Sequence, residues 1–226
     1  MNKILAFDVS TNICSVALSE GRGIIACREE LTPSIQAEIL LELIEQVLVA
    51  AGYRYQDLDY IVTTNGPGSF TGIRIGLSAI SGIALAARNV KVAAVSNFEA
   101  SHYRATWQRK NYQKIIIILN AYRQQLYVQE FDKNGNLTKK PELINYPDVR
   151  KLLISAGEEV VCAGNGLAVI YNLVQDLDNI TILPRFPRIK AMHLCQLVND
   201  KINQDMAFLA PEPLYIRPPD AKKPDK

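Results

Sequence analysis

A glycine-rich segment at residues 65–76, Asn-Gly-Pro-Gly-Ser-Phe-Thr-Gly-Ile-Arg-Ile-Gly, has residue types that could bind an anion. It follows a β-branched run at 60–64, typical of a buried strand, and leads into an apolar stretch at 73–87 that favours a helix. This order lets backbone N–H groups and a helix N-terminus face an anion. The segment has neither the Walker nor the dinucleotide pattern. A tightly packed turn that binds nothing, with Ser69 or Thr71 as helix cap, explains the same residues equally well.

A second polar turn follows the first apolar run of the chain. Asp8, Ser10 and Thr11 lie between runs at 4–8 and 13–19 that read as strands. A carboxylate beside hydroxyl groups could contact a phosphate or a metal ion. Asp and Ser also stabilise ordinary turns through hydrogen bonds to their own backbone, so a plain turn is the alternative.

Histidine-dependent chemistry is not indicated. The chain has two histidines, His102 and His193, and neither has a partner at helical spacing. A His-x-x-x-His metal pair and a Ser-His-Asp arrangement are therefore both missing as sequence motifs. A lone histidine is more often a surface residue or a hydrogen-bonded core residue than a ligand.

The composition is that of a soluble globular protein. The 226 residues are 48% hydrophobic and 21% charged, and the net charge of +2 comes from scattered Lys and Arg, so avid nucleic-acid binding by the chain alone is not expected. No signal peptide is recognised at the N-terminus, and no stretch is judged long enough to span a membrane. The four cysteines lack CxxC spacing and are expected to be buried thiols in a reducing compartment. These features predict a cytoplasmic protein without membrane contact.

Alternating β-rich and helical patterns predict an α/β fold with a joint near residue 100. Ser96 and Glu99 predict a capping box, Gly52 a helix C-cap and Asn134-Gly135 a hairpin turn. The expected strands are 4–8, 13–19, 24–31, 60–64, 90–95, 114–119, 125–132 and 159–163, and the expected helices are 33–51, 73–87, 96–109, 167–177 and 189–203.

The first two predicted helices carry more apolar surface than one sheet can cover. In the second, Gly72, Gly76, Ala79, Gly82 and Ala86 recur at spacings of four, three, three and four, which predicts a stripe open to close helix approach. Burial wholly within one chain is the alternative. We expect a four-helix contact, formed by residues 34–51 and 72–87 with the same helices of a related subunit. The predicted interface residues are Ile35, Ile39, Leu43, Gly76, Ala79, Ile80 and Ile83.

The segment 65–76 resembles the signature of the TsaB (YeaZ-like) family over all twelve residues. The ending Leu214-Tyr215-Ile216-Arg217 is similar to the family's Pro-x-Tyr-x-Arg, and the likeness extends from Asp8 to Arg217. The resemblance implies the actin/Hsp70/sugar-kinase-like (ribonuclease H-like) superfold, with two subdomains whose mixed sheets are flanked by helices. We expect subdomains at 1–100 and 101–217, the second of them reduced, and a disordered tail at 218–226.

The superfold also implies phosphate-contacting positions in this sequence. Its first hairpin cradles phosphate, and Arg123 matches the family's Asp-Ala-Arg at the second phosphate position. Asn120 replaces the Asp there, which argues against nucleotide hydrolysis by this chain. Gly164-Asn165-Gly166 resembles the superfold's adenosine-side loop. The nucleotide-contacting residues implied in this way are Asp8, Ser10, Thr11, Gly68, Ser69, Arg123, Gly164 and Gly166.

The resemblance implies a non-catalytic scaffold in the machinery that makes threonylcarbamoyladenosine in tRNA. Its expected partners are a metal-bearing TsaD-type catalytic subunit, a TsaE-type ATPase, a second copy of the chain when alone, and tRNA through the complex. We expect no catalytic residue, no resident metal and no tightly bound cofactor, with ATP or ADP at the subunit interface. A stand-alone kinase-like phosphotransferase or peptidase, and a nucleotide-binding homodimeric regulator, are the alternatives.

Overall fold

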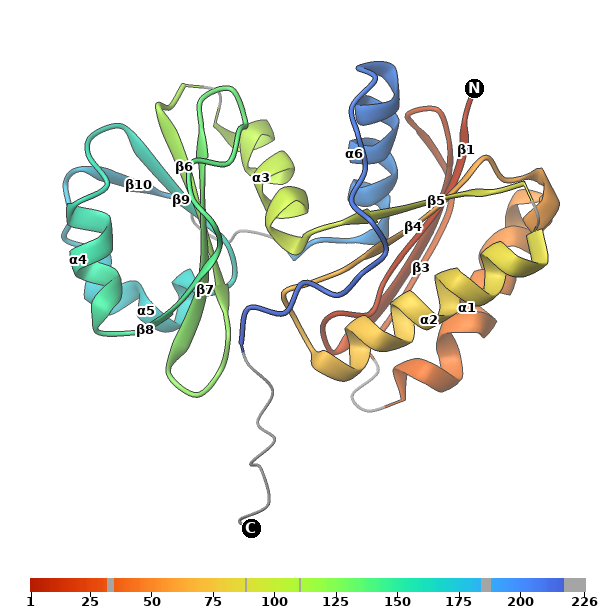
Figure 1. Cartoon of the computed structure of the whole chain (residues 1–226), viewed down its shortest axis with the longest axis horizontal. Helices are drawn as coiled ribbons and strands as arrows, with labels where there is room; N and C mark the ends of the chain where they lie inside the picture. The colour runs from red at the N-terminus through yellow and green to blue at the C-terminus, as the bar shows by residue number, and fades with distance from the viewer. Residues whose placement is uncertain (32–34, 88, 110, 184–187, 218–226) are drawn as a thin grey trace, which may run out of the picture.

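Two five-stranded sheets form the framework of the molecule (Figure 1). The computed structural model describes residues 1–31, 35–87, 89–109, 111–183 and 188–217, so the predicted tail at 218–226 lies outside the described residues. The first sheet contains β1 (Lys3–Asp8), β2 (Ile13–Glu20), β3 (Gly23–Leu31), β4 (Tyr60–Thr64) and β5 (Lys91–Val95). The second contains β6 (Lys114–Asn120), β7 (Gln125–Asp132), β8 (Glu142–Asn145), β9 (Val160–Ala163) and β10 (Ile180–Ile182).

The two sheets repeat one topology. Their orders are β3-β2-β1-β4-β5 and β8-β7-β6-β9-β10. In each, the first three strands form an antiparallel meander, and the last two run parallel to the central strand. A parallel partner needs a crossover, and helices supply it in both halves. The expectation of two mixed sheets flanked by helices is therefore confirmed, although the sequence shows no repeat.

The helices complete a layered arrangement. α1 (Gln36–Ala51) and α2 (Phe70–Ala87) cover the outer face of the first sheet, and α4 (Asp148–Ile154) and α5 (Leu167–Val174) cover that of the second. α3 (Asn97–Gln108) and α6 (Ala191–Asn203) lie between the two sheets (Figure 1). A short 3-10 helix, η1 (Tyr55–Asp57), precedes β4.

Each half contributes its last helix to the other half. α6 follows β10, yet its Leu194 and Cys195 pack on the first sheet. Conversely, Phe98 and Ala105 of α3 pack on the second sheet. The chain then returns along the first sheet, where Leu209 bridges to Ala94. The apolar inner face of each sheet is thus covered by a helix from a distant part of the chain, and the division into 1–100 and 101–217 stays a prediction.

Several local predictions are confirmed by hydrogen bonds. The Ser96 hydroxyl accepts from the Glu99 N–H at 3.0 Å, and the Glu99 carboxylate accepts from the Ser96 N–H. Gly52 ends α1 in the left-handed conformation, and Ser69 caps α2 by accepting from the Gly72 N–H at 3.2 Å. The prediction missed β8, α4 and β10, which have three to seven residues each and too few turns or alternations to give a pattern.

The length prediction for α2 is wrong. The helix has 18 residues and a mean hydropathy of 1.5, which meets the length and composition of a membrane-spanning helix. In this structure several apolar side chains of α2 pack within the chain itself, since Ile73, Ile80 and Ile83 are buried. A core helix of this kind passes the same hydropathy test.

The cysteine prediction holds for three of four thiols. Cys14, Cys162 and Cys195 are buried, and burial raises the pKa of each thiol to about 12. Cys27 is exposed instead. The reason is its place on β3, the outer strand of the first sheet, where most side chains are not covered.

Candidate functional site

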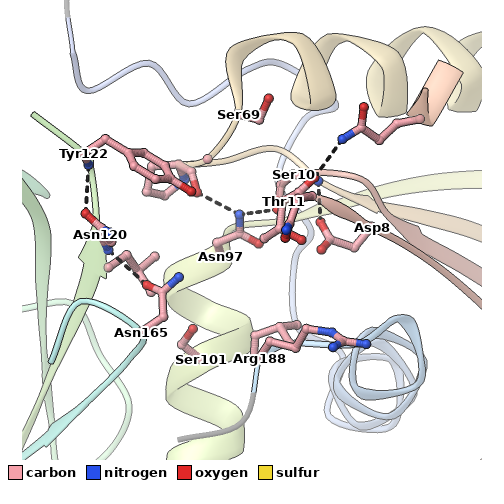
Figure 2. A pocket seen from close by; sticks show the side chains of 16 residues that line it. Asp8, Ser10, Thr11, Ser69, Asn97, Ser101, Asn120, Tyr122, Asn165 and Arg188 are labelled. Carbon is pink, nitrogen blue, oxygen red and sulfur yellow. Dashed lines mark hydrogen bonds between the residues drawn. The ribbon is translucent and has the colours of Figure 1, made fainter. Parts of the chain in front are cut away.

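A cleft of about 420 Å³ lies where the central strands of the two sheets end (Figure 2). Asp8, at the end of β1, marks the first half, and Asn120, at the end of β6, marks the second. Polar residues from both halves line it: Asp8, Ser10, Thr11, Asn12, Gln36, Ser69, Asn97, Ser101, Asn120, Tyr122, Asn165 and Arg188. The cleft therefore brings together Asp8, Ser10, Thr11, Gly68 and Ser69 of the predicted site.

Asp8 is a buried carboxyl, with only 3% of its surface exposed. Its Oδ1 accepts from the Ser10 N–H at 3.1 Å and from the Thr64 hydroxyl at 2.5 Å. Burial raises the pKa of Asp8, and the hydrogen bonds from Thr64 and Ser10 oppose that rise without cancelling it. The side chain thus holds the turn between β1 and β2 together.

We expect Asp8→Asn to change how stability depends on pH. The folded pKa of Asp8 lies above the unfolded value of 3.8, so the wild type loses stability as pH rises through the window between the two. Asparagine keeps the Oδ1 acceptor and has no proton to lose. The free energy of unfolding of Asp8→Asn, relative to wild type, should therefore increase from pH 4 to pH 7 in urea titrations.

The exposed Asp178 provides the control for this measurement, as Asp178→Asn. A pH-independent difference between Asp8→Asn and wild type would contradict the raised pKa.

The glycine-rich segment packs directly on the turn after β1. A Cβ atom on Gly72 would lie 1.9 Å from the Val9 carbonyl oxygen, and one on Gly68 would lie 2.7 Å from that of Ser10. The Ser69 N–H donates to the Ser10 carbonyl oxygen at 2.8 Å. Several N–H groups of the segment are thus bonded to the protein itself, which gives these glycines a packing role; anion binding here stays a prediction.

Asn97, which sequence reasoning missed, joins these two turns. Its Nδ2 donates to the Ser10 hydroxyl at 2.9 Å and to the Pro67 carbonyl oxygen at 2.8 Å, and its N–H donates to the Gly66 carbonyl oxygen (Figure 2). The only sequence signal was its position directly after a predicted helix cap. Ser101, one turn later on α3, also faces the cleft.

The second half repeats this packing with its own glycines. A Cβ atom on Gly164 would lie 2.1 Å from the Ile118 carbonyl oxygen, and the Gly166 N–H donates to the same oxygen at 3.0 Å. These glycines position Asn165, whose Oδ1 accepts from the Asn120 N–H at 3.0 Å. Gly164 and Gly166 are therefore not in the lining of the cleft, although Asn165 is.

The residues of the cleft fit a metal-bound nucleotide poorly. Among the described residues that line it, Asp8 is the one carboxylate and Arg188 the one cation. Asn120, in place of an acid, is engaged with the Tyr122 N–H at 2.8 Å. Within the described ranges, no group of three or more His, Cys, Asp or Glu side chains could hold a metal ion.

His193 is buried and His102 is partly buried. His102 stacks on Phe131 with ring centroids 4.3 Å apart, and the Nδ1 of His193 accepts from the Lys190 N–H. Burial lowers the pKa of each to about 4. Both imidazoles are accordingly expected to be neutral near pH 7.

A second cavity, of about 640 Å³, shares Pro67, Gly68, Ser69, Asn120 and Tyr122 with the cleft. Arg123 lies here beside Gly68 and Ser69, whereas the predicted contacts Asp8, Ser10 and Thr11 line the cleft and not this cavity. The wall of this cavity includes the C-terminal segment 214–217.

An apolar groove of about 470 Å³ runs between α1 and α2. Its lining includes Leu41, Phe70, Ile75, Ser78 and Ala79. Four of the predicted interface residues, Leu43, Gly76, Ile80 and Ile83, are covered by the chain's own core. Within the predicted stripe of small residues, Gly72 and Gly76 are buried, because helical periodicity turns them toward the first sheet. Ala79 is half-buried, and Gly82 and Ala86 are exposed. Of the predicted interface residues before α2, Ile39 is half-buried and Ile35 is 41% exposed.

Comparisons with known proteins agree on one family. Residues 31–224 match the family model described as "TsaD: tRNA N6-adenosine threonylcarbamoyltransferase". The chain is similar to the Escherichia coli (strain K12) "tRNA threonylcarbamoyladenosine biosynthesis protein TsaB", at 29% identity over 152 residues. That match covers 63% of this chain and 64% of the relative, so it spans just under two thirds of the relative's length.

Solved structures establish the fold. A Pseudomonas aeruginosa protein "with similarity to peptidase YEAZ" superposes with a TM-score of 0.77 at 24% identity, over 96% of this chain and all of that one. A putative N-acetylmannosamine kinase from Listeria monocytogenes superposes with a TM-score of 0.58 at 11% identity, over 89% of this chain and 99% of that one. The expected actin and sugar-kinase superfold is therefore confirmed.

Proposed function

The chain belongs to the family described as TsaD: tRNA N6-adenosine threonylcarbamoyltransferase, as a TsaB (YeaZ-like) protein, and we propose that it acts there as a non-catalytic scaffold. In this proposal it binds a metal-bearing TsaD-type subunit, which transfers a threonylcarbamoyl group to the adenosine beside the tRNA anticodon. The observation that carries the proposal is family membership over most of the chain, combined with the residue set of the cleft.

The cleft supports a role without chemistry of its own. Phosphoryl transfer needs a metal clamp and a positioned base. Asp8 is held by Ser10 and Thr64, and Asn120 supplies an amide where an acid is expected. We propose that the cleft holds the two halves in a fixed shape, and that no cofactor is tightly bound there.

The groove between α1 and α2 is the surface we propose for the partner. Leu41 is 52% exposed and Phe70 is 47% exposed, so apolar surface remains after the chain has covered its own sheet. Burial of such side chains contributes roughly 1.5–3 kcal/mol each. A partner with the same superfold would present a similar surface, so the homodimer and the heterodimer would compete for this groove. We further propose that ATP or ADP binds at the subunit interface, and that a TsaE-type ATPase joins the assembly in the cytoplasm.

The test is reconstitution with the TsaD-type subunit, with and without tRNA and ATP. We expect a heterodimer in size-exclusion chromatography at the expense of the homodimer, and threonylcarbamoyl transfer only when both subunits are present. Transfer by the TsaD-type subunit at an unchanged rate without this chain would refute the scaffold role.

A stand-alone phosphotransferase or peptidase, and a homodimeric regulator, are the competing functions. Turnover of ATP or of a peptide by the purified chain alone would favour an enzyme. Persistence of the homodimer in the presence of the TsaD-type subunit would favour a regulator.

A further inference from the structure

The second cavity is lined by aromatic rings and arginines. Arg74 Cζ lies 3.7 Å from the ring centroid of Phe70, and its Nε donates to the Tyr215 hydroxyl at 3.0 Å. The rings of Phe70 and Tyr215 are 5.3 Å apart at 31°. Tyr122, also in the lining, is 73% exposed. Partly exposed aromatic rings around one cavity provide flat surfaces on which another ring can stack.

The charged side chains among the described residues that line this cavity are arginines. Arg74, Arg123 and Arg217 line it, and the described lining residues include no carboxylate. The three arginines come from α2, from the turn between β6 and β7, and from the C-terminal segment. Nη2 of Arg217 donates to the Ala121 carbonyl oxygen at 2.9 Å, which fixes the segment against the turn. The cavity therefore suits a ligand that combines an aromatic ring with negative charge.

The turn that carries Tyr122 is held in an unfavourable conformation. Tyr122, Arg123 and Gln124 have φ values of 57°, 52° and 60°, a region that favours glycine and asparagine. The Asn120 side chain accepts from the Tyr122 N–H, and the Gln124 carbonyl oxygen accepts from the Tyr146 N–H, so neighbouring residues maintain the turn. Strained backbone of this kind is concentrated at ligand-contacting sites.

We propose that this cavity binds an unpaired nucleotide of an RNA strand. The base stacks on Tyr122 or on the Phe70–Tyr215 pair, and the phosphates face Arg74 and Arg217. An RNA strand is favoured over a free nucleotide because the cavity continues into the cleft, with which it shares Gly68 and Ser69. The identification of the ligand as RNA rests on the proposed function, whereas the aromatic rings and arginines of this cavity are observed independently of it.

The test measures binding of a labelled hexa-adenylate to the isolated chain by fluorescence anisotropy, beside a calorimetric titration with AMP. We expect saturable binding of the oligonucleotide, weakened about tenfold by Tyr122→Ala, the effect of losing one stacked base. Two phosphate contacts, made by Arg74 and Arg217, predict a slope of log K against log salt of about −1.4. Tyr171→Ala, which removes an exposed tyrosine from α5, is the matched control and should bind like wild type.

A strain-relieving variant separates binding from folding. Tyr122→Asn combined with Gln124→Gly places favoured residues in the left-handed turn, so its urea midpoint should rise while oligonucleotide binding is lost. Three outcomes would overturn the proposal: no saturable oligonucleotide binding, no effect of Tyr122→Ala, or AMP bound as tightly as the oligonucleotide. Because no partner subunit is present in this assay, its failure is distinguishable from failure of the scaffold role.

Discussion

Gly72→Ala is expected to destabilise the protein by about 3 kcal/mol, the upper range for inserting an atom into a packed interior. Its added Cβ would lie 1.9 Å from the Val9 carbonyl oxygen, which is a backbone atom and cannot rotate away as a side chain could. Relief requires α2 to move away from the end of β1, which would also disturb the Ser69–Ser10 hydrogen bond. Urea denaturation followed by circular dichroism measures the loss directly.

Gly82→Ala is the matched control in the same helix. A Cβ atom at Gly82 has no heavy atom within 4 Å, so the substitution should stabilise α2 by about 0.5–1 kcal/mol through helix propensity. Equal changes in the free energy of unfolding for Gly72→Ala and Gly82→Ala would show that α2 does not pack closely on the turn after β1 in solution.

Gly82→Arg is expected to weaken association with the TsaD-type subunit, and with a second copy, at least about a hundredfold, or roughly 3 kcal/mol. Gly82 lies one turn beyond Ser78 of the groove and has open space around it in the single chain. If Gly82 lies in a contact between helices of two subunits, an arginine side chain at this position would be buried there without an ion-pair partner. The single chain itself should gain stability, since arginine is a much better helix former than glycine.

Val169→Arg is the control for this charge. Val169 is 46% exposed on α5, in the other half of the molecule. It should leave association unchanged, as measured by analytical ultracentrifugation. If folded Gly82→Arg still forms both complexes with wild-type affinity, the partner surface lies elsewhere on the chain.

Local features of the chain could be predicted because their causes are local. The Ser96–Glu99 capping box, the Gly52 C-cap and the Ser69 cap depend on residues within a few positions of each other. The run at 60–64 is fully buried as β4. The twelve residues at 65–76 and the family they resemble gave the superfold correctly.

The candidate site could be predicted only in part. Asp8, Ser10, Thr11 and Ser69 were placed together because each follows a recognisable strand or turn. Asn97 and Arg188 were missed, since they reach the cleft only because the fold brings them beside residues that are far from them in the sequence. Arg123 was assigned correctly to a turn, but that turn presents it to the second cavity.

By itself, the sequence determined the order of the longer elements, several of their caps and the family, since hydrophobic period and turn chemistry act over short distances. Tertiary structure alone decided what the small residues do. Gly72 and Gly164 allow a helix or loop to approach a strand-end carbonyl closely, whereas Gly82, in the same helical run as Gly72, faces open space. It also decided that α3 and α6 exchange halves. Which face of a helix is covered depends on the elements packed against it, and these come from distant parts of the chain.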